Sequence, residues 1–211
     1  MLKLLSATPS PYARKVRIAL AEKAIPFELV TENPWNADAS TPTLNPLGKL
    51  PVLLLDDGST VYESAYILEW LEVHYPDPPL FPADPHQRLA ARRIEVLADG
   101  VCDAVVLSVL EGLRTPAQRS EPWLARQARK IEGGLAEVAR LVPDSGYCVG
   151  GVFGLADLSA GTMLGYLSGR YGHLDWRGRY PHLAAFHDRL LARPSFRDTQ
   201  PVPQHMEPGV V

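Results

Sequence analysis

The chain has 211 residues, of which 46% are hydrophobic and 21% are charged. These values are ordinary for a globular protein, so the composition excludes a disordered chain and a collagen-like fibre. The formal net charge of −3 is too balanced for a protein that binds nucleic acid electrostatically, and we expect no nucleic-acid partner. Only two cysteines occur, Cys102 and Cys148, so we expect neither a disulfide framework nor a zinc cluster.

No run in the sequence approaches the roughly 18 apolar residues of a membrane span, so we expect no membrane partner. The apolar stretch at residues 2–5 is too short for a signal peptide, and Pro9 and Pro11 follow it at once. We therefore expect a soluble cytoplasmic protein.

The chain begins with a strand–helix–strand pattern. Residues 2–5 and 27–31 are apolar runs that predict strands, and the apolar spacing of residues 11–24 predicts a helix between them. A βαβ unit of about 30 residues has a right-handed crossover, which makes its two strands parallel.

A hairpin and a helix follow. Residues 51–55 and 60–62 flank the sequence Asp56-Asp57-Gly58-Ser59, which is a strong turn signal, and residues 64–75 have helical spacing. The order βαβ and then ββα predicts a thioredoxin-like α/β domain, in which a small mixed sheet has helices on both faces.

Prolines divide the chain. Five of them fall between Pro76 and Pro85, a density that neither a helix interior nor a central strand tolerates. The sequence therefore predicts a first domain at residues 1–76, a linker at 77–87 and a second domain at 88–211. The second domain is predicted to be an all-α helical bundle because its apolar residues have helical spacing in four segments: residues 88–113, 122–141, 155–168 and 181–192.

Ser10 stands between the first strand and the first helix, in the sequence Ser10-Pro11-Tyr12-Ala13. Redox proteins of this plan have two cysteines here, and because neither is present, dithiol chemistry is excluded. Ser10 has two possible roles. It is a suitable N-cap, since Pro follows it at the first helical position, and its hydroxyl could also donate to an anion at the positive end of the helix.

Two further pairs of residues suggest a peptide ligand. If the Leu50-Pro51 bond is cis, the Leu50 N–H and C=O face outward and can pair with the backbone of a ligand, as an added strand would. At the start of the next helix, Ser64 can hold a carboxylate and Glu63 can hold an amine, which together describe the α-amino-acid end of a ligand. Helix capping is the alternative role of this second pair.

Three segments together resemble the N-terminal domain of the glutathione S-transferase family: Ser10-Pro11-Tyr12-Ala13-Arg14-Lys15-Val16, Gly48-Lys49-Leu50-Pro51-Val52-Leu53 and Tyr62-Glu63-Ser64. They have the usual spacing of that family, and the linker and helical half extend the resemblance to about Phe196. The resemblance is greatest to small bacterial members with serine in the catalytic position.

This resemblance implies that glutathione is a co-substrate and that Ser10 is the catalytic residue, which donates a hydrogen bond to the glutathione thiolate. It assigns glutathione binding to Lys49, Leu50, Pro51, Glu63 and Ser64, and it implies no metal. A small hydrophobic electrophile would bind over the helical domain, which fits a role in detoxification. The family also implies a homodimer.

Several alternatives stay open. Lys49 either pairs with the glycyl carboxylate of glutathione or only solvates its turn. Conjugation, isomerisation, dehalogenation and peroxide reduction are all compatible with the sequence. A non-enzymatic relative such as the stringent starvation protein, which uses the fold for protein contacts, is the alternative to an enzyme. The presence of Ser10, Leu50-Pro51 and Glu63-Ser64 favours the enzyme.

A few other residues have weaker signals. Ser6 and Thr8 are minor alternatives for the thiol contact. Arg114 and Asp103 lie on or just after the long helix that would border the electrophile pocket. Asp157, in the sequence Phe153-Gly154-Leu155-Ala156-Asp157-Leu158, resembles the family's helix-capping residue, and we assign it a structural role.

Overall fold

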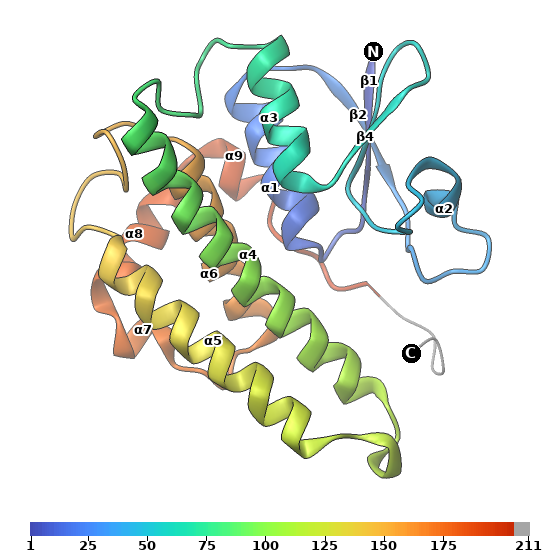
Figure 1. Cartoon of the computed structure of the whole chain (residues 1–211), viewed down its shortest axis with the longest axis vertical. Helices are drawn as coiled ribbons and strands as arrows, with labels where there is room; N and C mark the ends of the chain where they lie inside the picture. The colour runs from blue at the N-terminus through green and yellow to red at the C-terminus, as the bar shows by residue number, and fades with distance from the viewer. Residues whose placement is uncertain (205–211) are drawn as a thin grey trace. The chain divides into compact units, whose positions relative to one another are not determined.

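The computed structural model describes residues 1–204 of the chain. The chain forms two compact units (Figure 1). The first contains Met1–Leu80 together with the C-terminal segment that begins at Pro194, and the second contains Phe81–Arg193. Within residues 1–204, no helix is long and apolar enough to cross a membrane.

The sheet of the first unit has four strands in the order β2-β1-β3-β4: β1 (Leu2–Ser6), β2 (Phe27–Thr31), β3 (Val52–Leu54) and β4 (Thr60–Tyr62). β1 and β2 are parallel, as the βαβ pattern predicts, whereas β1–β3 and β3–β4 are antiparallel. β1 is central and mostly buried, and β2 is an exposed edge strand. The Lys3–Glu28 ion pair lies on this edge, where charges discourage pairing with another chain.

Four helices belong to the first unit: α1 (Pro11–Glu22), α2 (Thr41–Leu44), α3 (Ser64–His74) and α9 (Pro194–Arg197). Figure 1 shows α1 and α3 on one side of the sheet and α2 on the other, which confirms the predicted thioredoxin-like plan. Two of the helices, α2 and α9, were not predicted because four residues are too few to establish a helical period.

The C-terminal segment differs from the division predicted by the sequence, which placed residues 88–211 in one helical domain. In the structure α9 packs against α1 instead. The Arg14 guanidinium donates from Nη2 to the Phe196 carbonyl at 3.1 Å and lies over the Phe196 ring, which is fully buried. Burial of this aromatic ring is the physical reason why the segment leaves the helical unit.

The second unit is helical, as predicted: α4 (Pro85–Leu113), η1 (Pro116–Gln118), α5 (Glu121–Leu141), α6 (Leu155–Arg170), α7 (Trp176–Arg179) and α8 (Pro181–Leu191). α4 packs against both α5 and α6, and α6 is buried on nearly all sides, as a central helix must be. α4 begins earlier than predicted because Asp84 caps it, accepting from the Gln87 N–H at 2.8 Å.

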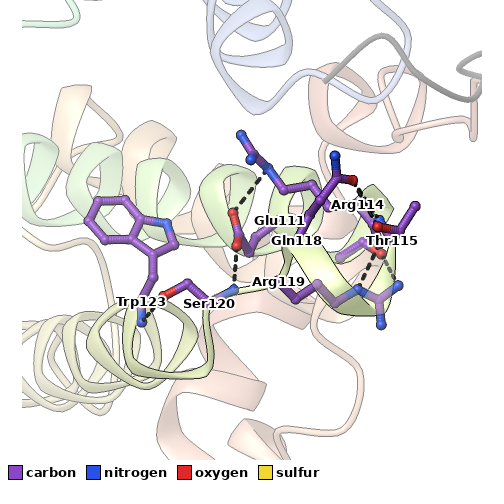
Figure 2. A network of polar contacts seen from close by, with 8 residues as sticks. Glu111, Arg114, Thr115, Gln118, Arg119, Ser120 and Trp123 are labelled. Carbon is purple, nitrogen blue, oxygen red and sulfur yellow. Dashed lines mark hydrogen bonds and ion pairs between the residues drawn. The ribbon is translucent and has the colours of Figure 1, made fainter.

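The turn between α4 and α5 is closed by its own polar side chains (Figure 2). Glu111 accepts from the Ser120 N–H at 2.7 Å and pairs with Arg114 at 3.3 Å. Arg119 donates to the carbonyls of Gly112 and Arg114, which end α4. These contacts satisfy the last carbonyls of α4 and give this turn a structural role.

Candidate functional site

Ser10 ends a tight turn and begins α1. Its N–H donates to the Ala7 carbonyl at 3.1 Å, and its Oγ accepts from the Ala13 N–H at 3.2 Å. The residue is therefore the N-cap of α1. This role uses only an acceptor position of the hydroxyl, whose O–H proton has no partner among residues 1–204. The capping role and the donor role predicted for Ser10 are thus compatible.

Positive charge accumulates in the first turns of α1. Arg14 and Lys15 are buried, and Arg17 is half-buried. Burial, together with the charge of Arg17, lowers the pKa of Arg14 to about 10, so its guanidinium is still cationic at neutral pH. The helix dipole has the same sign at this end, and both effects favour an anion beside Ser10.

The Leu50–Pro51 peptide bond is cis, which is the condition on which the predicted pairing of the Leu50 backbone with a ligand depends. Leu50 is half-buried and lies just before β3, and neither its N–H nor its C=O has a hydrogen-bond partner among residues 1–204. An extended peptide could therefore pair with this backbone.

Asn45 fixes the turn that leads to Leu50. Its buried side chain accepts from the Leu47 N–H at 2.9 Å and donates to the Lys49 carbonyl at 2.7 Å. Gly48 has φ +61°, a left-handed conformation that favours glycine. The Lys49 side chain is exposed and has no ion pair among the described residues, so the structure does not decide between its two predicted roles.

Glu63 has an unusual backbone at the start of α3. Its φ is +72° with ψ +127°, a conformation that non-glycine residues rarely adopt and that is often retained at functional sites. The Glu63 carboxylate accepts from the N–H groups of Ala65 and Tyr66, so the capping alternative is present in the structure.

Ser64 adjoins this cap. It is 1% exposed, and its hydroxyl donates to Glu63 Oε1 at 3.2 Å. Glu63 is exposed, and its carboxylate accepts from three donors, the Ser64 hydroxyl and the N–H groups of Ala65 and Tyr66. The Ser64 N–H, at the first position of α3, has no partner among residues 1–204.

The strand register places these three segments at the same end of the sheet, where β1 and β4 end and β3 begins. Leu5 in β1 pairs with Val52 in β3, and Val52 pairs with Tyr62 in β4. The turn to Ser10 therefore leaves the sheet at the same end where the Leu50–Pro51 segment enters it and where Glu63–Ser64 follow β4. A hydroxyl donor, a peptide backbone and a helix N-terminus meet at this end, which suits an anionic peptide.

The weaker candidates have other roles. Ser6 is buried and its hydroxyl donates to the Ala7 carbonyl, and Arg114 belongs to the α4–α5 turn. Both cysteines are free thiols, and burial, followed by the charge of Asp157, raises the pKa of Cys148. No group of three or more His, Cys, Asp or Glu residues within positions 1–204 could hold a metal.

Asp157 has the structural role that we assigned to it. It accepts from the Gly154 N–H at 3.0 Å and from the Cys148 N–H at 2.8 Å, and it is almost fully buried. Sequence reasoning missed the role of Asn45, although its Asn-Pro-Leu-Gly sequence is a turn signal. It also missed the C-terminal segment beside α1, for which the sequence has no local signal.

Two family models match the chain. The glutathione S-transferase N-terminal domain matches residues 9–74, and the glutathione S-transferase C-terminal domain matches residues 121–189. Among similar proteins, the Escherichia coli uncharacterized GST-like protein YibF is 38% identical, over 95% of this chain and 98% of that protein. A Pseudomonas aeruginosa maleylacetoacetate isomerase is 32% identical, over 99% of this chain and 100% of that protein.

Two solved structures are similar throughout. A Methylobacterium radiotolerans glutathione S-transferase in complex with glutathione sulfonate has a TM-score of 0.97 and 63% identity, covering 100% of this chain and 99% of that chain. A Methylobacillus flagellatus glutathione S-transferase with bound glutathione has a TM-score of 0.92 and 42% identity, covering 96% of this chain and 100% of that chain.

Proposed function

The chain belongs to the glutathione S-transferase family, and we propose that it binds glutathione and transfers the glutathionyl group, through its sulfur, to a small hydrophobic electrophile. The observation that carries this proposal is the meeting of Ser10, Leu50–Pro51 and Glu63–Ser64 at one end of the sheet. The relatives crystallised with glutathione or glutathione sulfonate support the same ligand for this chain.

Each part of glutathione has a matching group. The backbone of Leu50 pairs with the cysteinyl residue. Ser64 holds the γ-glutamyl carboxylate through its N–H, and its hydroxyl turns from Glu63, to which it donates in the ligand-free chain, to the same carboxylate. Glu63 holds the γ-glutamyl amine. Of the two predicted roles of Lys49, the proposal uses the pairing with the glycyl carboxylate. Pro51 contributes through its cis peptide bond, which turns the N–H and C=O of Leu50 toward the ligand.

Ser10 acts on the sulfur. A free thiol has a pKa near ~8.5, so only a few per cent is ionised at neutral pH. The Ser10 O–H donates to the thiolate, and the α1 N-terminus adds its dipole. Lowering the thiol pKa by roughly two units requires about 2.7 kcal/mol, which a charge-assisted hydrogen bond and a helix terminus can supply together.

The transfer step balances without a cofactor. The thiol proton goes to water, and the thiolate attacks the electrophilic carbon to form a C–S bond. The displaced group leaves with the bonding electron pair, or the resulting carbanion takes a proton from water. Ser10 stays a hydrogen-bond donor throughout and forms no bond to the substrate.

Retention on immobilised glutathione tests the binding proposal. We expect the protein to be retained and eluted by free glutathione, and Ser64→Ala to weaken retention about tenfold because it removes a carboxylate contact. Ser59→Ala is the matched control, since Ser59 bonds Asp57 in the hairpin at the opposite end of the sheet. Passage of the wild-type protein straight through the column would refute the proposal.

Glutathione-dependent isomerisation is a second candidate, supported by the similarity to the Pseudomonas aeruginosa maleylacetoacetate isomerase. The thiolate would add to a conjugated cis double bond, rotation would follow, and elimination would return the thiolate. Stoichiometry separates the two reactions. Conjugation consumes one glutathione for each product molecule, whereas isomerisation consumes none.

We also propose a homodimer. The exposed apolar residues Leu89 and Val96 are seven positions apart on α4, and Tyr66 and Val73 have the same spacing on α3. Each pair exposes two apolar side chains two helical turns apart, which a second copy of the chain would cover. Light scattering should give about twice the chain mass, and Val96→Glu should lower it toward the monomer.

The cellular setting is likewise a proposal: a detoxification enzyme of the bacterial cytoplasm. The free thiols of Cys102 and Cys148 fit a reducing compartment. Fractionation of cells that produce the protein would test this, and recovery outside the cytoplasmic fraction would contradict it.

A further inference from the structure

The residues that follow α9 form an extended segment along the first unit. We call residues 198–204 the C-terminal strap. The Val202 N–H donates to the Thr8 carbonyl at 3.3 Å, and the Gln204 side chain donates to the Glu32 carbonyl at 3.4 Å. Thr8 lies inside the turn that ends at Ser10, and Glu32 directly follows β2. The strap therefore crosses the end of the sheet where the Ser10 site lies.

The strap starts from a fixed anchor. Phe196 is fully buried, and its carbonyl accepts from Arg14, which is 3% exposed. Ser195 donates to Glu22 near the end of α1, and Thr199 donates to the Ser195 carbonyl at 2.6 Å. These contacts fix the start of the strap against α1. The later residues of the strap therefore begin from a defined position beside the Ser10 turn.

The Ser10 turn is held at its two ends and along its middle. At its end, the Ser10 N–H donates to the Ala7 carbonyl, and the Ser10 carbonyl accepts from the Arg14 N–H of α1. In its middle, the strap supplies the bond to the Thr8 carbonyl. The Ser10 hydroxyl is oriented both by this turn, of which Ser10 is the last residue, and by the bond that its Oγ accepts from the Ala13 N–H of α1, so a displaced turn would strain that cap. Small displacements of a catalytic group reduce turnover considerably, even when substrate binding is retained.

We propose that the C-terminal strap is a positioning element of the Ser10 site, acting through the Val202 N–H on Thr8. The proposal rests on the proposed function, because it assigns the strap to the Ser10 donor. The strap touches neither the sulfur nor the electrophile in this role. Val202 is 58% exposed, and its main-chain N–H, and not its side chain, makes the contact.

Two substitutions at one position separate backbone from side chain. Val202→Pro removes the donating N–H and keeps an apolar residue between Pro201 and Pro203, where the extended backbone accepts proline. Val202→Ala keeps the N–H and shortens the side chain. We expect Val202→Pro to lower kcat about fivefold with an aryl halide, with an unchanged KM for glutathione, and Val202→Ala to stay within about twofold of wild type.

Hydrogen exchange of the ligand-free protein supplies a second readout. The amides of Ala7, Thr8 and Ser10 should exchange faster in Val202→Pro than in Val202→Ala, while the amides of β1 stay protected. If Val202→Pro does not fold, a chain that ends at Gln200 replaces it, with the same expected loss of kcat and the same faster exchange.

Two results would overturn the proposal: equal kcat in wild type and Val202→Pro, or a larger loss in Val202→Ala than in Val202→Pro. The second result would assign the effect to the side chain. Failure of the proposed function is distinguishable, because it would abolish glutathione retention by the wild type while leaving the exchange difference at residues 7–10 intact.

Discussion

The two ends of α1 have polar side chains that differ in how far their hydrogen bonds are satisfied. At the N-terminus the half-buried Ser10 accepts from Ala13 and keeps its O–H proton available. At the C-terminus the Lys23 ammonium, in a residue 5% exposed, donates to the carbonyls of Tyr75 and Pro78 and pairs with Glu72, each at 2.8 Å. An ammonium has three donors, so this end is saturated.

The difference separates a helix end whose hydrogen bonds are all used within the chain from one that can still bind a ligand. A fully satisfied polar group lowers the energy of the folded chain and has no capacity left for a ligand. A helix N-terminus whose cap still holds a proton, in positive surroundings, can bind an anion. Unused hydrogen-bonding capacity is therefore more informative about function here than residue type, because both ends are polar.

A substitution at the C-terminal end of α1, where all three donors of Lys23 are used, should have the largest effect on stability. Lys23→Met removes the cation and leaves two carbonyls and a carboxylate without it, so we expect a loss of about 3–4 kcal/mol in the free energy of unfolding. Lys3→Met is the matched control. Its ion pair with Glu28 is exposed, and its loss should cost less than about 0.5 kcal/mol. Urea unfolding measures both, and equal losses would contradict the comparison.

The unsaturated end should affect chemistry more than stability. Ser10→Ala removes the donor to the thiolate, so we expect kcat at neutral pH to fall between about 10- and 100-fold while the KM for glutathione changes little. The lost N-cap should also cost about 1 kcal/mol of stability. Steady-state kinetics with an aryl halide and a thermal melt measure the two effects.

The activity of Ser10→Ala should depend on pH in a defined direction. Without the donor, the pKa of the bound thiol returns toward ~8.5, so the variant should regain activity as the pH is raised through that value. Ser10→Thr keeps the hydroxyl and serves as the control, with a profile near that of wild type. An unchanged profile in Ser10→Ala would remove Ser10 from its assigned role.

The sequence predicted most of the fold because its strands and long helices are locally encoded. Residues 27–31 and 60–62 have the predicted bounds, and the turn signal at Gly58 lies in the observed hairpin. The four-residue helices α2 and α9 were missed, since their formation depends on packing. The place of the C-terminal segment beside α1 was missed for the same reason, because it depends on the distant partners Arg14 and Phe196.

For the candidate site, the sequence suggested residues but did not specify their backbone geometry. The sequence could suggest Ser10, Leu50–Pro51 and Glu63–Ser64 because each has a local pattern. It could not show that Glu63 caps its helix from a positive φ, or that Asn45 holds the turn from a buried position. Those facts depend on backbone conformation and on bonds across several residues, which residue type alone does not specify.

A substitution of Asn45 tests, with a smaller expected effect, whether the turn before Leu50 contributes to glutathione binding. Asn45→Ala removes the bonds to Leu47 and Lys49 that shape the turn before Leu50, so we expect the KM for glutathione to rise between about three- and fivefold with little change in kcat. Thr43→Ala, in the exposed part of α2, is the control. A fall in kcat with an unchanged KM would mean that Asn45 acts on the sulfur end instead.

Asp157 gives the finest comparison, because its buried carboxylate accepts from the N-cap Gly154 at the start of α6 and from Cys148. Burial raises its pKa above the ordinary value, against the opposing hydrogen bonds from Cys148 and Gly154. Between the ordinary and the raised pKa the folded chain binds more protons than the unfolded one, so the contribution of Asp157 to stability falls as pH rises through that window.

Asp157→Asn cannot titrate and should lack this dependence. We expect it to be less stable by about 1 kcal/mol at the acidic end of the window, where both side chains are neutral, because an amide mimics the cap imperfectly. The difference in the free energy of unfolding between wild type and Asp157→Asn should become smaller as pH rises, since only the wild type then buries a charge. Urea unfolding across this pH range measures this difference. A difference that widens with pH would mean that the bonds from Cys148 and Gly154 outweigh burial, and the pKa of Asp157 would then lie below its ordinary value.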